Sequence, residues 1–269
     1  MANASYVIRG GVEGRARLRL LSEVMSPSTS ALLAEVGIPQ GAACLDVGCG
    51  GGDVTLALAR VTGANGRVLG VDFDATKLSI AREEAAEQDL DNVAFELQDV
   101  TQWPPDELFD VVYARFLLTH LPDPAAAVSS LRQRLGPGGV MIIEDIDFSG
   151  HFSEPACPAL QRYVEFYTRA ARRRGADPNI GPRLPRLLRE AGLADVRMQL
   201  VQPAALEGGV KSLICVTLES IADTVINDRI ATAAEVRETR EELEAFASDP
   251  HTVLGGPRIF QVWGRNDEA

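Results

Sequence analysis

A glycine-rich segment bracketed by two carboxylates is the first feature of this chain that could do chemistry. Residues 45–53 read LDVGCGGGD, so Asp46 and Asp53 flank the glycines. Glycines that directly follow a strand let the backbone approach a ligand closely at the start of a helix. The dinucleotide fingerprint GxGxxG, read from Gly48, would need a glycine in place of Asp53. Read from Gly50 instead, it would need a glycine in place of Thr55. The two carboxylates favour a cationic ligand over a pyrophosphate, because opposite charges attract.

Two further acids follow the next two predicted strands. Asp72 ends the second strand, 24 residues after Gly48, and Asp99 follows the third strand. An ionised carboxylate offers two acceptor oxygens, so Asp72 could hold both hydroxyls of a ribose. The alternative role, capping the helix that starts at Ala75, better suits Asp74. Asp99 could accept a hydrogen bond from the exocyclic amine of an adenine, or it could be a polar loop residue.

The elements that must position these acids alternate between short apolar runs and helical stretches. Strands are predicted at residues 43–47, 67–72, 93–97, 109–114 and 139–145. Helices are predicted between them, near residues 53–60, 75–88 and 124–135. Such alternation, with apolar β-branched strands, is typical of an α/β fold with a doubly wound parallel sheet. The carboxyl ends of the strands in such a sheet line the binding site.

Outside this alternation the pattern changes. Apolar residues up to Met25 predict an N-terminal helix, and Ser26 followed by Pro27 predicts the start of a second helix that Gly37 closes. Proline is well placed at the first position of a helix, which is the basis of this prediction. We expect residues 1–37 to form N-terminal helices that cover the site. After residue 145, the sequence predicts helices near 158–174 and 183–191 and strands near 195–200 and 258–264.

Almost sixty residues separate the last two predicted strands, and a connection this long is usually functional. One apolar helical face is formed by Ile214, Leu218, Ile221 and Val225. Thr232 and Glu235 have the spacing of a capping box, which predicts a further helix. We expect residues 205–250 to form a helical lid, inserted into a core of residues 38–204 and 251–269. The apolar face either packs on the core or lines a binding pocket, and packing is the favoured alternative.

Taken together, the motifs resemble those of the class I S-adenosylmethionine-dependent methyltransferases. The resemblance covers residues 40–150 and rests on DVGCGGG (46–52), Asp72, Asp99-Val100, FDVV (109–112) and LGPGG (135–139). It implies a Rossmann-like sheet of seven strands whose last strand is antiparallel. It also implies S-adenosyl-L-methionine as the cofactor and S-adenosyl-L-homocysteine as its product.

The resemblance assigns roles at the methionine end of the cofactor. The glycine segment would cradle the methionine part through Gly48, Cys49, Gly50 and Gly52. Asp46 would lie beneath the cofactor. Arg115, just past the fourth strand, falls where the backbone of family members meets the cofactor's amino group.

At the adenosine end, the resemblance implies that Asp72 holds the ribose and that Asp99 meets the adenine amine. Phe73 and Val100 would flank the adenine ring. Lys77 occupies a position that often touches the ribose, although family members usually have methionine or glutamine there.

The sequence after the fourth strand is closest to members that act on small molecules in bacterial metabolism, where Leu121-Pro122-Asp123-Pro124 is common. Nucleobase N-methyltransferases have an Asn/Asp-Pro-Pro-aromatic motif at residues 113–116, where this chain reads YARF, and the Pro-Cys nucleophile of cytosine C5 enzymes is absent. The Asp-Asn pair of metal-dependent catechol methyltransferases comes late in the sheet, and Asp91-Asn92 lies too early. We predict a small-molecule acceptor and no metal.

A general base is needed only when the atom that accepts the methyl group carries a proton. The histidines are His120, His151 and His251, and His120 is the best placed because it closely follows the fourth strand. We predict His120 as the catalytic residue, with a structural role as its alternative. Whether an oxygen, a nitrogen or a carbon is methylated stays open at this point.

Charge and composition narrow the partners. The chain of 269 residues has 38 acidic and 26 basic residues, a net charge of −12, which disfavours binding to nucleic acid. Eight arginines between residues 160 and 190 form either a solvated helix face or an anion-contacting patch, and the solvated face is favoured. No run of about 20 apolar residues predicts a membrane span. The N-terminus lacks an apolar signal core and the four cysteines lack a disulfide pattern, so we expect a cytoplasmic protein.

Two other functions stay open beside methyl transfer. A non-catalytic S-adenosylmethionine-binding sensor or partner module would use the same cofactor residues. A nicotinamide oxidoreductase is disfavoured because the glycine fingerprint fails at Asp53. The sequence also leaves the oligomeric state open, including a homodimer.

Overall fold

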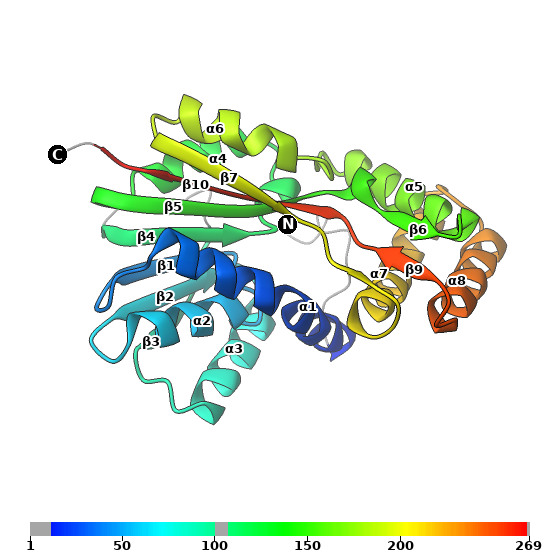
Figure 1. Ribbon diagram of the computed structural model, residues 1–269, viewed down its shortest axis with the longest axis horizontal. Coiled ribbons are helices and arrows are strands. Elements are labelled where there is room, and N and C mark those ends of the chain that lie inside the picture. The colour runs from blue at the N-terminus through cyan, green and yellow to red at the C-terminus, as the bar shows by residue number, and fades with distance from the viewer. Residues whose placement is uncertain (1–11, 100–106, 268–269) are drawn as a thin grey trace.

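The computed structural model describes residues 12–99 and 107–267, and its centre is a sheet of seven strands (Figure 1). In the order β3-β2-β1-β4-β5-β10-β7, β10 runs antiparallel to both of its neighbours and the other neighbouring pairs are parallel. The bounds are β1 (Ala43–Val47), β2 (Arg67–Asp72), β3 (Val93–Leu97), β4 (Phe109–Arg115), β5 (Leu135–Asp147), β7 (Ala194–Val201) and β10 (Arg258–Arg265). The predicted Rossmann-like sheet with an antiparallel last strand is confirmed.

Helices cover both faces of this sheet, as the alternating sequence predicts. The first face carries α2 (Asp53–Thr62), α3 (Ala75–Glu87) and the C-terminal part of α1 (Val12–Val36). The second face carries α4 (Pro124–Arg132) and α6 (Leu184–Glu190), which follows the short turn η3 (Gly181–Arg183). Successive side chains of a strand point to opposite faces, so Cys44 packs in the first core and Leu45 in the second. Burial on both faces explains why the strands read as continuous apolar runs.

The boundary between α4 and β5 differs from the prediction. The helix ends at Arg132 rather than near residue 135, and β5 begins at Leu135 rather than at residue 139. The reason is that the LGPGG segment is already extended, since Leu135 pairs with Phe109 of β4 before the register shifts. Glycine and proline there mark an irregular strand start instead of a loop.

The predicted break at Ser26-Pro27 is wrong, because α1 is one helix with Pro27 inside it. An internal proline removes a backbone hydrogen bond and costs about 3 kcal/mol or more. Tertiary packing on both sides of Pro27 opposes this cost. Met25 is buried among the helices beyond the strand ends, and Leu32 and Leu33 are buried against the sheet. The helix therefore bridges two cores, which local sequence signals do not reveal.

Beyond the carboxyl ends of the strands lies a layer of helices, which we call the helical layer (Figure 1). It consists of α5 (Pro158–Arg173), α7 (Gly209–Asn227) and α8 (Ala233–Ser248). A small antiparallel sheet in the order β6-β9-β8 connects it to the core, with β6 (Phe152–Glu154), β8 (Ala204–Ala205) and β9 (Val253–Gly255). The range 205–250, expected to form a helical lid, contains the two helices α7 and α8.

The apolar face of α7 packs into the core of the helical layer. Its members are at most 3% exposed: Ile214, Leu218, Ile221 and Val225. The favoured alternative, packing, is confirmed for this face, although Ile214 also lines the cavity described below. The capping box at the start of α8 is also confirmed, since Thr232 and Glu235 exchange the two expected hydrogen bonds.

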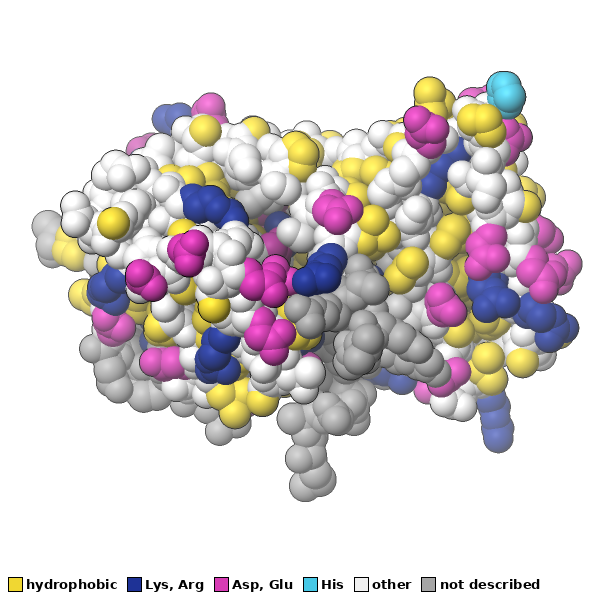
Figure 2. Space-filling model, turned by 90° about the horizontal axis from the view of Figure 1, so that it is seen from below, with side chains coloured by type: hydrophobic (Ala, Val, Ile, Leu, Met, Phe, Trp, Pro, Cys, Tyr) yellow, Lys and Arg dark blue, Asp and Glu magenta, His cyan; other side chains and the backbone are white. Residues whose placement is uncertain are grey.

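The arginines between residues 160 and 190 mostly pair with nearby acids. Ion pairs are formed by Arg162, Arg169, Arg174, Arg183 and Arg186. On the face shown in Figure 2, lysine and arginine side chains are scattered among acidic ones. The pairing supports the solvated helix face rather than the anion-contacting patch. Within the described residues, no helix is long and apolar enough to cross a membrane, and all four cysteines are free thiols.

Candidate active site

A cavity of about 470 Å³ lies between the carboxyl ends of the strands and the helical layer. One part of its wall, the strand-end half, includes Asp46, Gly48, Gly50, Asp72, Lys77 and Asp99. The opposite part, the helical half, includes Met25, Phe148, His151, Tyr163, Tyr167 and Ile214. The α1 helix runs between the sheet and α7, so it contributes to the wall as well (Figure 1). The structure thus brings most of the predicted cofactor residues together at one end of a larger pocket.

The glycine loop after β1 has a backbone shape that requires glycine. Gly48, Gly50 and Gly52 have φ values of +72°, +54° and +86°, in the left-handed region that side chains disfavour. A Cβ on Gly52 would lie 2.9 Å from Cβ of Ala81, whereas a Cβ on Gly50 would meet nothing within 4 Å. The loop is therefore packed tightly on its helix side, and at Gly50 it leaves open space at the cavity wall.

Asp72 ties this loop to the end of β2. Its Oδ2 accepts a hydrogen bond from the Gly50 N–H at 3.0 Å, and its Oδ1 accepts one from the Asp74 N–H at 2.9 Å. A carboxylate oxygen can accept more than one hydrogen bond, so both oxygens retain capacity for a ligand's hydroxyls. Asp74 itself caps α3 by accepting from the backbone of Thr76 and Lys77, as predicted.

Asp46 is almost completely buried at the base of the cavity. Its Oδ2 accepts a hydrogen bond from the hydroxyl of Thr55 at 2.6 Å, and its side chain is 1% exposed. Burial raises the pKa of Asp46 to about 7, because a charge is poorly solvated there. A cationic ligand above it would favour the ionised form.

The adenosine end of the strand-end half is more open. Phe73 is 48% exposed, and Nζ of Lys77 lies 5.8 Å from the centroid of its ring. Asp99 also lines the cavity and is exposed. Val100, the second predicted adenine neighbour, lies outside the described residues.

Arg115 belongs to a buried network rather than acting alone. Its guanidinium pairs with Asp53 and donates to the hydroxyl of Thr29 at 3.2 Å. Thr29 in turn donates to Glu144 at 3.1 Å, and Glu144 also accepts hydrogen bonds from Tyr113 and Gln261. Burial raises the pKa of Glu144 to about 7. The network joins α1 to the strand ends, a function for Arg115 that the sequence resemblance did not indicate.

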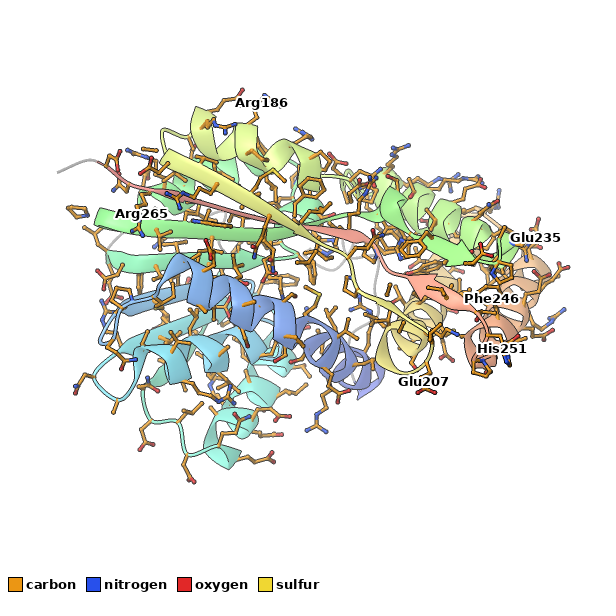
Figure 3. All side chains as sticks on the ribbon, in the orientation of Figure 1. Arg186, Glu207, Glu235, Phe246, His251 and Arg265 are labelled. Carbon is orange, nitrogen blue, oxygen red and sulfur yellow. The ribbon has the colours of Figure 1, made fainter. Side chains whose placement is uncertain are left out.

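Two of the three histidines line the cavity. His120 lies in the turn η1 (Leu118–His120) directly after β4, and burial lowers its pKa to about 4, helped by the charges of Lys77 and Arg17. His151 follows the turn η2 (Phe148–Gly150) after β5 and lies in the helical half. His251 is 91% exposed at the outer end of the helical layer, away from the cavity (Figure 3).

The helical half is mainly apolar and aromatic. Phe148 stacks on Tyr167 with ring centroids 3.8 Å apart, and both side chains are 4% exposed. Arg17 of α1 donates to the hydroxyl of Thr217 of α7 at 3.3 Å, across 200 residues of sequence. Sequence reasoning missed these residues, because Phe148 follows a strand and the others are ordinary members of helices until the fold brings them together. Only Arg17 and Thr217 lie in the segments expected to cover the site, whereas Phe148 and Tyr167 lie in the segment expected to form the core.

The remaining acids of β5 serve the structure. Asp145 accepts hydrogen bonds from the backbone of Thr119 and Ile146, and Asp147 pairs with Arg258 at 2.6 Å. Within the described residues, no group of three or more histidine, cysteine, aspartate or glutamate side chains is arranged to hold a metal ion.

Comparison with known proteins points to one family. Residues 38–177 match the family described as "Methyltransferase domain". The chain is also 31% identical, over 137 residues, to the demethylmenaquinone methyltransferase of Staphylococcus aureus strain MRSA252. That match covers 51% of this chain and 54% of the relative, so the chain spans about half the length of the curated relatives it matches.

Solved structures share the fold at low sequence identity. Coclaurine N-methyltransferase, bound to N-methylheliamine and S-adenosylhomocysteine, is 16% identical with a TM-score of 0.57, over 89% of this chain and 72% of that one. The cyclase SpnF is 20% identical with a TM-score of 0.56, over 90% of this chain and 82% of that one. Because a cyclase and an N-methyltransferase share this fold, the fold alone does not define the reaction.

Proposed function

Because this chain belongs to the methyltransferase domain family, of the class I S-adenosylmethionine-dependent type, we propose that it transfers a methyl group from S-adenosylmethionine to a small molecule. The observation that carries the proposal is the position of Asp72. This carboxylate both fixes the glycine loop and lines the cavity, so one residue could shape the cradle and hold a ribose. Open space at Gly50 leaves room for a ligand against the backbone.

The remaining strand-end residues fit the cofactor in the roles that the family implies. Gly48, Cys49, Gly50 and Gly52 would cradle the methionine part, above Asp46. Asp99 would accept from the adenine amine, with Phe73 and Val100 on the two sides of the ring. Lys77 lies beside Phe73, within reach of the same ring system. Arg115, held by Asp53, would act by fixing the start of α2 rather than by contacting the cofactor through its side chain.

The charge of the strand-end half suits this cofactor. When bound, S-adenosylmethionine supplies a methyl group on a positively charged sulfur, and the acceptor attacks the carbon of this methyl group in line with the carbon–sulfur bond. Asp46, Asp53 and Asp72 line this half and would attract the positive charge. The protein's main contribution would then be to orient the acceptor and exclude water, which can be worth about 7–11 kcal/mol.

The two groups of helices would supply that enclosure. We assign residues 1–37, of which the structure describes only 12–37, and residues 205–250 to the cover of the site, because α1 and α7 both line the cavity. The core of residues 38–204 and 251–269 would then hold the cofactor. The catalytic role of His120 stays a prediction, supported by its place at the junction of the two halves of the cavity.

Labelled methyl transfer tests the proposal. Purified protein would be incubated with S-adenosylmethionine carrying an isotopically labelled methyl group and with a metabolite extract of a bacterium. Mass spectrometry should detect a labelled product with the wild-type chain and far less with Asp72→Ala. If labelled cofactor binds but no extract yields a product, the alternative of a non-catalytic binding module is favoured. We also keep as predictions that the protein is cytoplasmic and that it binds neither nucleic acid nor membranes. A homodimer is one predicted assembly.

A further inference from the structure

His151 is held in one orientation at the wall of the helical half. Its Nδ1 lies 2.7 Å from the carbonyl oxygen of Phe148, which is a hydrogen bond that the neutral ring makes as a donor. The ring also lies against Phe148, with centroids 4.4 Å apart, and meets Tyr163 edge-on at 5.6 Å. With the proton on Nδ1, the lone pair of the neutral ring is on Nε2.

The charge around His151 favours its neutral form. Burial lowers the pKa of His151 to about 4, although Asp147 nearby opposes this shift. The other charged groups of this part of the wall are two arginines. Arg174 is paired with Asp228, and Arg17 donates to Thr217. Neutral imidazole, able to accept a proton at Nε2, is therefore the ground state of this residue.

The lining of the cavity indicates what kind of acceptor would lie beside His151. All acidic side chains that line the described part of the cavity belong to the strand-end half: Asp46, Asp53, Asp72 and Asp99. The helical half offers no carboxylate to a protonated amine. It offers instead the faces and edges of Phe148, Tyr163 and Tyr167, which suit a planar ring. Aromatic faces can also attract a cation, but two arginines and no carboxylate line the described part of this half, so a neutral aromatic molecule matches it better.

We propose, on the basis of the methyl transfer proposed above, that the acceptor is a hydroxylated aromatic molecule and that Nε2 of His151 takes the proton of its hydroxyl group. The hydroxyl oxygen forms the new bond to the methyl carbon as the bond from that carbon to the cofactor's sulfur breaks. The bonding electrons stay on sulfur, which becomes a neutral thioether. The hydroxyl proton passes to Nε2, and the imidazolium later releases it to water, so charge and atoms balance.

A weak base is sufficient for this step. As the oxygen–carbon bond forms, the hydroxyl group becomes a much stronger acid than it is in the free acceptor. The positive charge also leaves the sulfur while it arrives on the imidazole, so the dry cavity never has to hold two positive charges. A histidine kept neutral by burial can therefore accept the proton late in the reaction.

The first test compares acceptors of one shape and different charge. Wild-type protein saturated with S-adenosylhomocysteine would be titrated with 2-naphthol, 2-naphthylmethylammonium and 2-naphthoate. The proposal expects 2-naphthol to bind most tightly. Tighter binding of the ammonium would overturn the acceptor class, and tighter binding of the carboxylate would assign the helical half to an anion held by Arg17.

The second test uses His151→Asn, which keeps a hydrogen-bond donor near the Phe148 carbonyl but has no basic nitrogen. Methyl transfer to 2-naphthol should fall about 100-fold or more in kcat, with little change in KM. Transfer to a nitro-substituted naphthol that is already ionised at the assay pH should fall less than about threefold, because it needs no base. A residue that only supports the structure would lower both rates equally, and that result would overturn the role of His151.

His120→Asn is measured beside it, because His120 is the other neutral histidine on the cavity wall. If His120→Asn, and not His151→Asn, lowers methyl transfer to 2-naphthol much more than transfer to the ionised nitro-naphthol, the proposal is wrong. If S-adenosylhomocysteine binds normally but no naphthol is methylated by the wild-type protein, the hydroxyl-acceptor proposal fails. Failure to bind the cofactor at all would instead contradict the proposed function itself.

Discussion

The two halves of the cavity are built in different ways. The strand-end half comes from residues at or just past the carboxyl ends of β1, β2 and β3, and the sequence makes each of these strands apparent. The helical half comes from α1, η2, α5 and α7, whose contacts join residues as far apart as Arg17 and Thr217. Cofactor chemistry is thus encoded locally, whereas acceptor chemistry depends on long-range packing. The comparison predicts that substitutions in one half leave the other half's function intact.

The largest effect is expected on stability, from the core of the helical layer. Leu218 of α7 is 0% exposed, so Leu218→Ala should lower the free energy of unfolding by about 2–5 kcal/mol through lost burial and a cavity. Urea denaturation measures this change, and Glu219→Ala, on the exposed side of the same helix, is the matched control. The folded Leu218→Ala protein should still bind S-adenosylhomocysteine within about twofold of wild type, because no cofactor residue has moved. A large loss of cofactor affinity would show that the halves are not independent.

The next effect concerns Glu144, which joins the two halves through Thr29 of α1. Its pKa is 4.5 in an ordinary glutamate and about 7 in the folded protein, because of burial. Between these values the unfolded chain has released a proton that the folded chain keeps, so the stability that Glu144 contributes falls as pH rises. Glu144→Gln cannot ionise, so its unfolding free energy relative to wild type should rise from about pH 5 to about pH 8. Parallel pH profiles of the two proteins in urea denaturation would contradict the raised pKa.

Cofactor affinity should fall when Asp72 is replaced and should change little when Asp74 is replaced. Asp72→Ala removes acceptor oxygens from the cavity wall and should weaken S-adenosylmethionine binding by about 1.5–3 kcal/mol. Asp74→Ala is the control, because Asp74 caps α3 and should cost about 0.5–2 kcal/mol of stability without a comparable loss of affinity. Calorimetry measures both variants. Equal affinities for Asp72→Ala and wild type would move the ribose contact elsewhere.

The smallest effect is expected in the aromatic wall. Tyr167→Leu removes one of the rings of the cavity wall that would contact a bound naphthol, and such an aromatic pair is worth about 0.5–1.5 kcal/mol beyond burial. The affinity for 2-naphthol should fall by that amount while the affinity for S-adenosylhomocysteine stays unchanged. If Tyr167→Leu lowers only the affinity for S-adenosylhomocysteine, the helical half binds the cofactor, and the assignment of the two halves is wrong.

How far the sequence predicts this molecule follows the same division. The bounds of β1, β2 and β3 were predicted to the residue, since each is a short apolar run with a clear end. Asp74 was distinguished from Asp72 because capping geometry depends only on neighbours in sequence. The sequence did not predict the continuity of α1 through Pro27, because the packing of Met25 and Leu33 in separate cores decides it.

The same limit applies to the site. The glycine loop and the strand-end acids could be recognised from motifs, and all of them in the described residues line or adjoin one cavity. His151 and Tyr163 carry no motif, and their roles depend on contacts with Phe148 that only the fold creates. Arg115 was assigned through the family's backbone contact, yet its side chain pairs with Asp53, a partner 62 residues away.

The central claim is that the strand-end half binds S-adenosylmethionine and not a dinucleotide, and calorimetry of the wild-type protein tests it most directly. Titration with S-adenosylmethionine, S-adenosylhomocysteine and NAD should give micromolar-range binding for the first two ligands. NAD should bind far more weakly, because Asp53 stands where a dinucleotide loop needs glycine and the cavity wall repels a pyrophosphate. Tighter binding of NAD than of either S-adenosyl compound would contradict the account.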